Sequence, residues 1–217
     1  MATIYPSLLA ADPNKLETVL QQLDPLVPGF HIDIIDNKFA PNNGISVEKT
    51  NILAQLALKP LWVHIMVEDP DSYLDKLKLI PGSILTFHIE SHKHAGQMIE
   101  KIEAKGWLAS MAIKPKTGIN EVFPFLPKLH QVLIMSVEPG FAGQPFLPET
   151  LAKVGPLVGQ RQTAGLDFKI AMDGGIGIKN IVEIAAKGVD QLAVGSQIFD
   201  PAIGAAEAYK LLAAKIA

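Results

Sequence analysis

The sequence contains no cysteine and only one arginine, and each scarcity removes a class of chemistry. Without cysteine the chain forms no disulfide, no thiolate zinc site and no cysteine nucleophile. Because Arg161 is the single arginine, a clamp of arginines around an anion is not expected. The net charge of −3 gives no support for a nucleic-acid partner or for a basic surface that binds membranes.

Long apolar runs are also missing. No run reaches the roughly 18 apolar residues that predict a transmembrane helix. The first residues, MATIYPSLLAAD, lack the charged start and the apolar stretch of a signal peptide. We therefore expect a cytoplasmic protein that does not contact a membrane.

What the sequence does contain is a regular alternation of two kinds of segment. Its 217 residues are 48% hydrophobic, which is ample for a full core. Short β-rich runs predict eight strands, at 3–10, 30–36, 61–67, 84–90, 108–114, 131–137, 168–174 and 191–199. Amphipathic segments between them predict helices, at 13–23, 46–57, 71–79, 92–105, 148–163, 178–187 and 202–215. The segment after the fifth strand, GINEVFPFLPKL, is short and broken by two prolines.

Eight strands that are each followed by a helix predict a (β/α)₈ TIM barrel, with residues 1–217 forming a single domain. The competing architecture is a doubly wound open sheet. That fold would show fewer strands or a G-x-G-x-x-G turn near its start, and YPSLLAADPNK has none.

Polar residues occur at the ends of several predicted strands, where barrels of this kind carry their chemistry. His31 and Asp33 are two residues apart and so share one face of a strand. With His64 and Asp173 they form a donor set that suits Zn²⁺, Fe²⁺, Mn²⁺ or Co²⁺. Each residue also has a purely structural interpretation. His31 and Asp33 could form a buried ion pair, His64 could be a core histidine, and Asp173 could serve only to form a turn. Their coincidence at one rim favours a metal site, and His88 either faces this site or is structural.

Glycine-rich turns follow the sixth, seventh and eighth predicted strands, in VEPGFAGQPF, DGGIG and VGSQIF. Such turns expose backbone N–H groups that bind phosphate, and phosphate sites in barrels often lie there. The structural alternative is that each glycine only permits a tight turn. Three such turns in succession favour the phosphate interpretation.

Taken together, these motifs resemble the ribulose-phosphate 3-epimerase family. The matching segments are YPSLLAAD, HIDIIDNKFAPN, VHIMVEDPDSYL, TFHIESH, MSVEPGFAGQPF, MDGGI and VGSQIF, in family order along nearly the full length. The resemblance implies a barrel with one divalent metal ion that interconverts D-ribulose 5-phosphate and D-xylulose 5-phosphate. It implies the ligands His31, Asp33, His64 and Asp173, with Asp33 and Asp173 also serving as the acid and base.

The resemblance also implies where a ketose phosphate, the small-molecule partner, would bind. The implied substrate contacts are Ser7, His64, Gly140, Phe141, Ala142, Gly143, Asp173, Gly174, Gly175, Gly195 and Ser196. Association into a homo-oligomer is implied as well.

The sequence departs from the family pattern beside the predicted site. Ile35 replaces a methionine, Asn37 and Lys38 replace Gly-His, and Ala142 replaces a glycine. Asparagine tolerates a left-handed backbone, so Asn37 is expected to keep the turn. These changes leave two alternatives open. One is a 3-epimerase of a six-carbon ketose phosphate, of the allulose 6-phosphate type, and the other is a sugar-phosphate-binding barrel without turnover.

Overall fold

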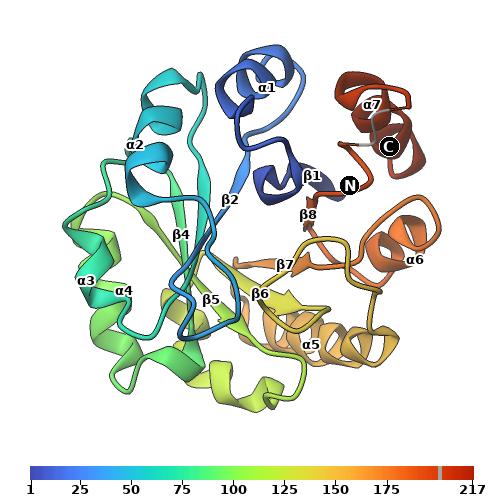
Figure 1. Ribbon diagram of the computed structural model, residues 1–217. Coiled ribbons are helices and arrows are strands. Elements are labelled where there is room, and N and C mark those ends of the chain that lie inside the picture. The colour runs from blue at the N-terminus through green and yellow to red at the C-terminus, as the bar shows by residue number, and fades with distance from the viewer. Residues whose placement is uncertain (200–201) are drawn as a thin grey trace.

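The computed structural model describes residues 1–199 and 202–217. Its eight strands are parallel and form one sheet in the order β1-β8-β7-β6-β5-β4-β3-β2. They are β1 (Thr3–Pro6), β2 (His31–Ile35), β3 (Trp62–Met66), β4 (Ile84–His88), β5 (Leu108–Ile113), β6 (Gln131–Met135), β7 (Lys169–Asp173) and β8 (Gln191–Val194). Figure 1 shows the strands at the centre with the helices around them, which confirms the predicted barrel.

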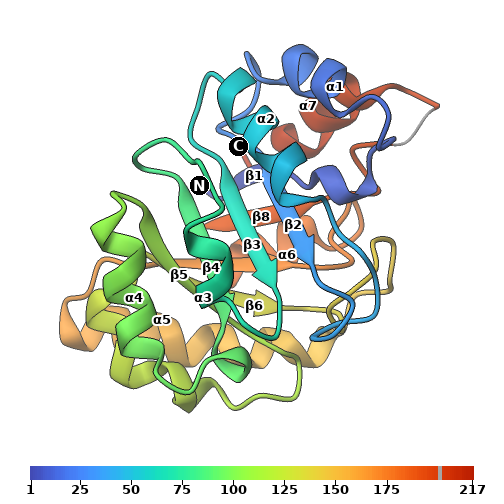
Figure 2. The same ribbon diagram turned by 60° about the vertical axis from the view of Figure 1, so that its left-hand side comes forward.

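The barrel closes between β1 and β2, where a single parallel bridge joins Ser7 to His31. Along the rest of the sheet the strands pair continuously, and Asp33 of β2 lies opposite His64 of β3. Figure 2 shows β2 and β3 side by side with their ends at the same rim. The closing seam therefore lies beside the predicted site.

The helices pack on the outside of the sheet. They are α1 (Leu16–Leu23), α2 (Val47–Leu56), α3 (Asp71–Leu74), α4 (Ala95–Ala104), α5 (Val154–Ala164), α6 (Ile181–Ala186) and α7 (Ala205–Lys215). Four 3₁₀ segments accompany them: η1 (Leu8–Ala10), η2 (Ile89–Ser91), η3 (Ile119–Lys128) and η4 (Pro148–Lys153). In α1 the residues Leu16, Leu20 and Leu23 are buried, the helical spacing that turns one face inward. Among the described residues no helix is long and apolar enough to cross a membrane.

Inside the barrel the two ends differ in chemistry. Near the strand starts, buried amides and hydroxyls satisfy one another. Ser110 Oγ donates to Gln131 Oε1 at 2.6 Å, and Gln131 Nε2 donates to Gln191 Oε1 at 2.6 Å. Gln131 and Gln191 are the first residues of their strands, whereas Asp173 is the last residue of its strand. The amide network thus closes the floor of the barrel and leaves the ionisable groups to the other end.

Four predicted strands are too long by two residues or more at their carboxyl ends. The strand predicted at 3–10 ends at Pro6, that at 84–90 at His88, that at 131–137 at Met135 and that at 191–199 at Val194. The chain turns at the rim, yet Leu8 and Ile198 beyond these ends are buried. Apolar residues therefore continue past the last sheet hydrogen bond, and the sequence pattern does not show where the strand ends.

Two helix predictions are also corrected. The helix predicted at 71–79 is a single turn, Asp71–Leu74. Asn51 of α2 explains why it stops, because its amide donates to Lys76 O at 2.9 Å and accepts from Lys78 N–H at 2.8 Å. The helix predicted at 148–163 begins with the 3₁₀ segment η4, and α5 starts only at Val154. Residues 119–128, for which no helix was predicted because of two prolines, form the 3₁₀ segment η3.

Candidate active site

Four ionisable side chains from three strands meet inside the barrel. His31 and Asp33 come from β2, His64 from β3 and Asp173 from β7. Each offers one potential ligand atom, and these atoms all lie within 4.8 Å of one another. The side chains of His31 and His64 are fully buried, that of Asp33 is 3% exposed and that of Asp173 is 15% exposed. The four side chains therefore converge as predicted, although His31 is the first residue of β2 and only Asp173 of the four ends its strand.

Asp33 is the centre of this cluster. Its Oδ1 lies 3.2 Å from His64 Nδ1, and its Oδ2 accepts a hydrogen bond from Ser7 Oγ at 3.0 Å. His31 Nδ1 is also 3.2 Å from Asp33 Oδ2, but without the alignment of a hydrogen bond. The same His64 Nδ1 lies 3.9 Å from Asp173 Oδ2, so one imidazole nitrogen faces both carboxylates.

The cluster moves the pKa values of the two carboxyl groups in opposite directions. Burial alone raises the pKa of Asp33, but the neighbouring His31 and His64 outweigh it and hold that pKa well below the usual range. Burial raises the pKa of Asp173 to about 6, with His31 opposing and the charge of Asp33 reinforcing the shift. Burial lowers the pKa of His31, but Asp33 outweighs it and the pKa rises. Burial and the charge of Asp33 therefore both disfavour a second negative charge at Asp173.

The residues present fit a divalent metal ion. Neither ring nitrogen of His31 has a hydrogen-bond partner in the described part of the chain, although both are buried. A buried nitrogen without a partner costs roughly 1–3 kcal/mol, and an ion in the cluster would remove that cost. Two imidazoles and two carboxylates are a common donor set for Zn²⁺, Mn²⁺, Fe²⁺ or Co²⁺.

Behind this cluster lies a second pair of ionisable residues. His88 Nε2 is 2.9 Å from His64 Nε2, and His88 Nδ1 is 3.0 Å from Glu90 Oε2. Burial lowers the pKa of His88 to about 4, against the opposing effect of Glu90. Burial raises the pKa of Glu90, but His88 and two hydrogen bonds from the β5–η3 loop outweigh it and lower that pKa to about 2. The sequence left the role of His88 open, and the structure places it against His64.

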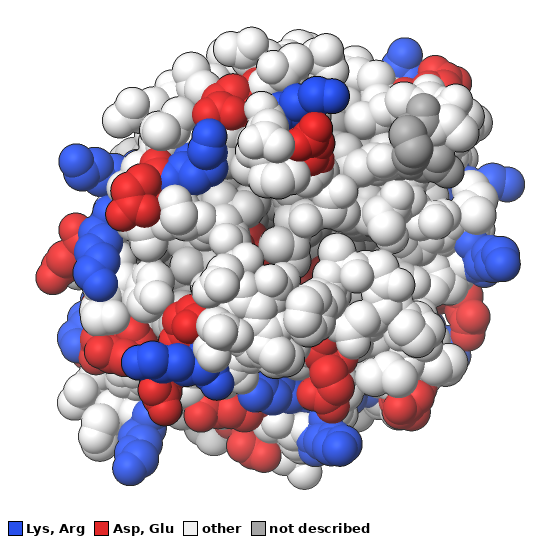
Figure 3. Space-filling view, in the orientation of Figure 1, with Lys and Arg blue, Asp and Glu red and all other residues white. Residues whose placement is uncertain are grey.

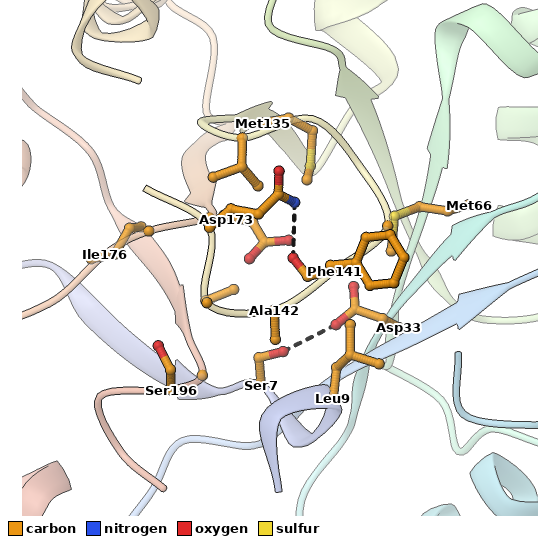
Figure 4. A pocket seen from close by; sticks show the side chains of 18 residues that line it. Ser7, Leu9, Asp33, Met66, Met135, Phe141, Ala142, Asp173, Ile176 and Ser196 are labelled. Atoms are coloured by element: carbon orange, nitrogen blue, oxygen red, sulfur yellow. Dashed lines mark hydrogen bonds between the residues drawn. The ribbon is translucent and has the colours of Figure 1, made fainter. Parts of the chain in front are cut away.

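The cluster opens into a small cavity of about 50 Å³. Figure 4 shows Asp33 and Asp173 at this cavity, with Ser7 bonded to Asp33. All predicted substrate contacts line it except His64, which lies buried beneath. The sequence reasoning did not place seven further lining residues among the substrate contacts: Leu9, Met66, Met135, Val137, Gln144, Ile176 and Ala193.

Packing explains part of the glycine requirement around the cavity. A Cβ on Gly140 would lie 2.8 Å from Pro41 O, and one on Gly175 would lie 2.6 Å from Phe146 Cα. Both glycines also have positive φ, of 137° and 63°. The structural alternative therefore holds for these two positions, which let the loops after β2, β6 and β7 pack closely.

The same turns nevertheless present unused donors to the cavity. The backbone N–H groups of Gly143, Gly175 and Ser196 have no hydrogen-bond partner among the residues described. Figure 3 shows acidic atoms at the floor of the central hollow and an uncharged rim on this face. Arg161 is engaged elsewhere, with its guanidinium 2.6 Å from Asp190 before β8. An anion at this end of the cavity would therefore meet backbone amides.

The departures from the family pattern are accommodated locally. Asn37 has a φ of 57°, so the expected left-handed turn is confirmed, and its Oδ1 accepts the Asn42 N–H at 3.2 Å. Ile35 packs with Ala40 and Met66 in a small apolar cluster.

Solved structures show the same fold at low sequence identity. A 3-hexulose-6-phosphate synthase superposes with a TM-score of 0.69 at 13% identity, over 99% of this chain and all of that one. Phosphoribosyl anthranilate isomerase from Thermococcus kodakaraensis gives a TM-score of 0.68 at 10% identity, over 100% of this chain and 99% of that one.

Proteins related by sequence identify the family more narrowly than the fold does. Ribulose-phosphate 3-epimerase of Escherichia coli K12 is 35% identical over 199 residues, which is 91% of this chain and 88% of that protein. The cytoplasmic isoform from rice is 35% identical over 218 residues, 98% of this chain and 92% of that protein. A family model described as the ribulose-phosphate 3 epimerase family matches residues 3–199. The chain therefore belongs to the ribulose-phosphate 3-epimerase family, and it is an isomerase.

Proposed function

We propose that the chain is a metal-dependent 3-epimerase that interconverts D-ribulose 5-phosphate and D-xylulose 5-phosphate. The observation that carries this proposal is the placement of Asp33 and Asp173. They come from separate strands, belong to one buried His/Asp cluster, and line a cavity whose other end offers unpaired backbone N–H groups. The family match supplies the substrate class.

Inversion at C3 requires removal of a proton from one face of the sugar and delivery of a proton to the other. We assign these steps to Asp33 and Asp173, one as base and the other as acid, with roles exchanged in the reverse direction. Ser7 donates a hydrogen bond to Oδ2 of Asp33, and His64 Nδ1 lies 3.2 Å from its Oδ1. Among the residues that the structure describes, no side chain donates a hydrogen bond to the Asp173 carboxyl, which is the more exposed of the pair.

The divalent ion would be held by His31, Asp33, His64 and Asp173. When bound, it supplies positive charge that stabilises the enediolate as the proton leaves. Zn²⁺, Fe²⁺, Mn²⁺ and Co²⁺ all suit the donor set.

Substrate binding is assigned to the rest of the cavity. We place the phosphate against the turns that carry Gly143, Gly175 and Ser196, because their N–H groups are free to donate. Met66 and Met135 line the wall of the cavity and would exclude water from the reacting carbon. A cytoplasmic location, as named for the rice relative, and self-association remain predictions.

Deuterium incorporation at C3 tests this proposal. D-ribulose 5-phosphate is incubated in D₂O with metal-stripped protein, and then with each of the four ions restored. We expect label in D-xylulose 5-phosphate only when an ion is present, and absence of label with all four would overturn the proposal. The same assay with six-carbon ketose phosphates tests the alternative substrate. Residues 36–46, which contain the altered loop, do not line the cavity, and this favours the five-carbon substrate.

A further inference from the structure

Three side chains in hydrogen-bond contact, those of His64, His88 and Glu90, extend from the proposed metal site to the protein surface. His64 Nε2 lies 2.9 Å from His88 Nε2, and His88 Nδ1 lies 3.0 Å from Glu90 Oε2. His64 and His88 are fully buried, and Glu90 is 21% exposed. Because each imidazole has a partner at both ring nitrogens, these contacts constrain which nitrogen of each ring carries the proton.

Glu90 determines which ring nitrogens donate and which accept in this hydrogen-bonded series. Its Oε1 accepts the Lys114 backbone N–H at 2.8 Å and the Thr117 hydroxyl. The loop that supplies these donors is itself fixed, because Lys153 Nζ donates to Lys114 O and to Thr117 O, each at 2.8 Å. Glu90 is therefore held with Oε2 aimed at His88.

A carboxylate only accepts hydrogen bonds, so the bond to Glu90 requires a proton on His88 Nδ1. Full burial against a second imidazole favours neutral His88, whose Nε2 must then accept. The partner in that contact, His64 Nε2, must donate. A neutral His64 with its proton on Nε2 has its lone pair on Nδ1, which is the nitrogen that faces Asp33 and Asp173. A cation bound between Nδ1 and these carboxylates would accept that lone pair and would replace the 3.2 Å contact between Nδ1 and Asp33.

We infer that Glu90 and His88 are positioning residues that fix His64 in the tautomer whose Nδ1 is free to bind a metal ion. This inference rests on the proposed metal site. An imidazole must present an unprotonated nitrogen to a metal, and a hydrogen bond from its other nitrogen fixes both tautomer and orientation. Here the carboxylate acts on the metal ligand through an intervening histidine.

Nuclear magnetic resonance of ¹⁵N-histidine-labelled protein tests the inference directly, because long-range couplings report which ring nitrogen carries the proton. We expect the proton of His88 on Nδ1 with and without zinc, and that of His64 on Nε2 in the zinc-loaded protein. A proton on His88 Nε2 in the zinc-free protein would overturn the inference even if the protein binds no zinc. Failure of the wild-type protein to bind zinc would separately overturn the proposed metal site.

The Glu90→Gln variant tests the same series of hydrogen bonds by reversing its donors and acceptors. The amide oxygen would stay with the two donors of the 114–117 loop, so the amide NH₂ would face His88 and donate to Nδ1. That moves the His88 proton to Nε2 and the His64 proton to Nδ1, where it competes with the metal.

We expect zinc affinity in Glu90→Gln, measured by calorimetry at constant pH, to fall about 10- to 100-fold. The matched control is Glu100→Gln, since the Glu100 side chain is 63% exposed and its ion pair, among the described residues, is with Lys128 at the surface. Unchanged tautomers together with wild-type affinity in Glu90→Gln would contradict the inference. Lost affinity with unchanged tautomers would assign Glu90 a structural role instead.

Discussion

Replacing either carboxylate of the acid–base pair with its amide separates the two proton transfers that epimerisation couples. In Asp173→Asn the remaining carboxylate, Asp33, still reaches one face of C3. In Asp33→Asn the remaining carboxylate, Asp173, reaches only the opposite face. Each variant is expected to lose epimerisation while exchanging the C3 proton of one ketose phosphate with solvent. The two variants should exchange opposite epimers, because the carboxylates serve opposite faces.

The size of the effect follows from burial. A positioned acid or base contributes about 10²–10⁴ in rate. The side chain of Asp33 is 3% exposed and that of Asp173 is 15% exposed, so bulk water has little access to replace the missing group. We therefore expect kcat to fall by about 10³–10⁴, a barrier increase of about 4–5.5 kcal/mol.

The assay follows deuterium in both ketose phosphates during incubation in D₂O, with bound metal measured in each variant. Asp75→Asn is the matched control, because the Asp75 side chain is 93% exposed. Near-normal epimerisation by Asp173→Asn would refute the two-base reasoning. Exchange of both epimers by one metal-loaded variant would refute it equally, since it would require a single base to reach both faces.

Three further predictions concern stability. Zinc at 100 times its dissociation constant adds about 2.7 kcal/mol, so chelation should lower Tm by about 5–11 °C in calorimetry; an unchanged Tm would argue against the ion. Gln131→Leu leaves the Ser110 hydroxyl and the Gln191 carbonyl without their bonds at the barrel floor. It should cost about 2–4 kcal/mol in urea denaturation without changing kcat, and a cost below about 0.5 kcal/mol would contradict this account. Asp36 accepts three backbone N–H groups, which outweigh the effect of burial and lower its pKa. Its stabilisation is therefore complete above the pKa of unfolded aspartate and is lost as pH falls through the folded value. Urea midpoints of wild type and Asp36→Asn should differ near neutrality and converge in acid, and a constant difference would exclude this contribution.

The sequence predicted the barrel because its signal is repeated. Eight β-rich runs separated by amphipathic segments predict eight parallel strands, and parallel strands bring their carboxyl ends to one rim. For that reason His31, Asp33, His64 and Asp173 were predicted to meet. The strand ends were not predictable, because residues such as Leu8 remain buried after the sheet hydrogen bonds have stopped.

The sequence by itself therefore determined the architecture and the ionisable residues at its rim, because both depend on local periodicity and on the parallel topology. Only the tertiary structure decided how these residues face one another. The His64–His88 contact depends on the positions of two side chains on neighbouring strands, and the contact from Glu90 to the 114–117 loop depends on the path of a distant turn. The glycine at 175 is likewise required by Phe146 of another loop. Such relations are set by packing in three dimensions, and no spacing along the chain encodes them.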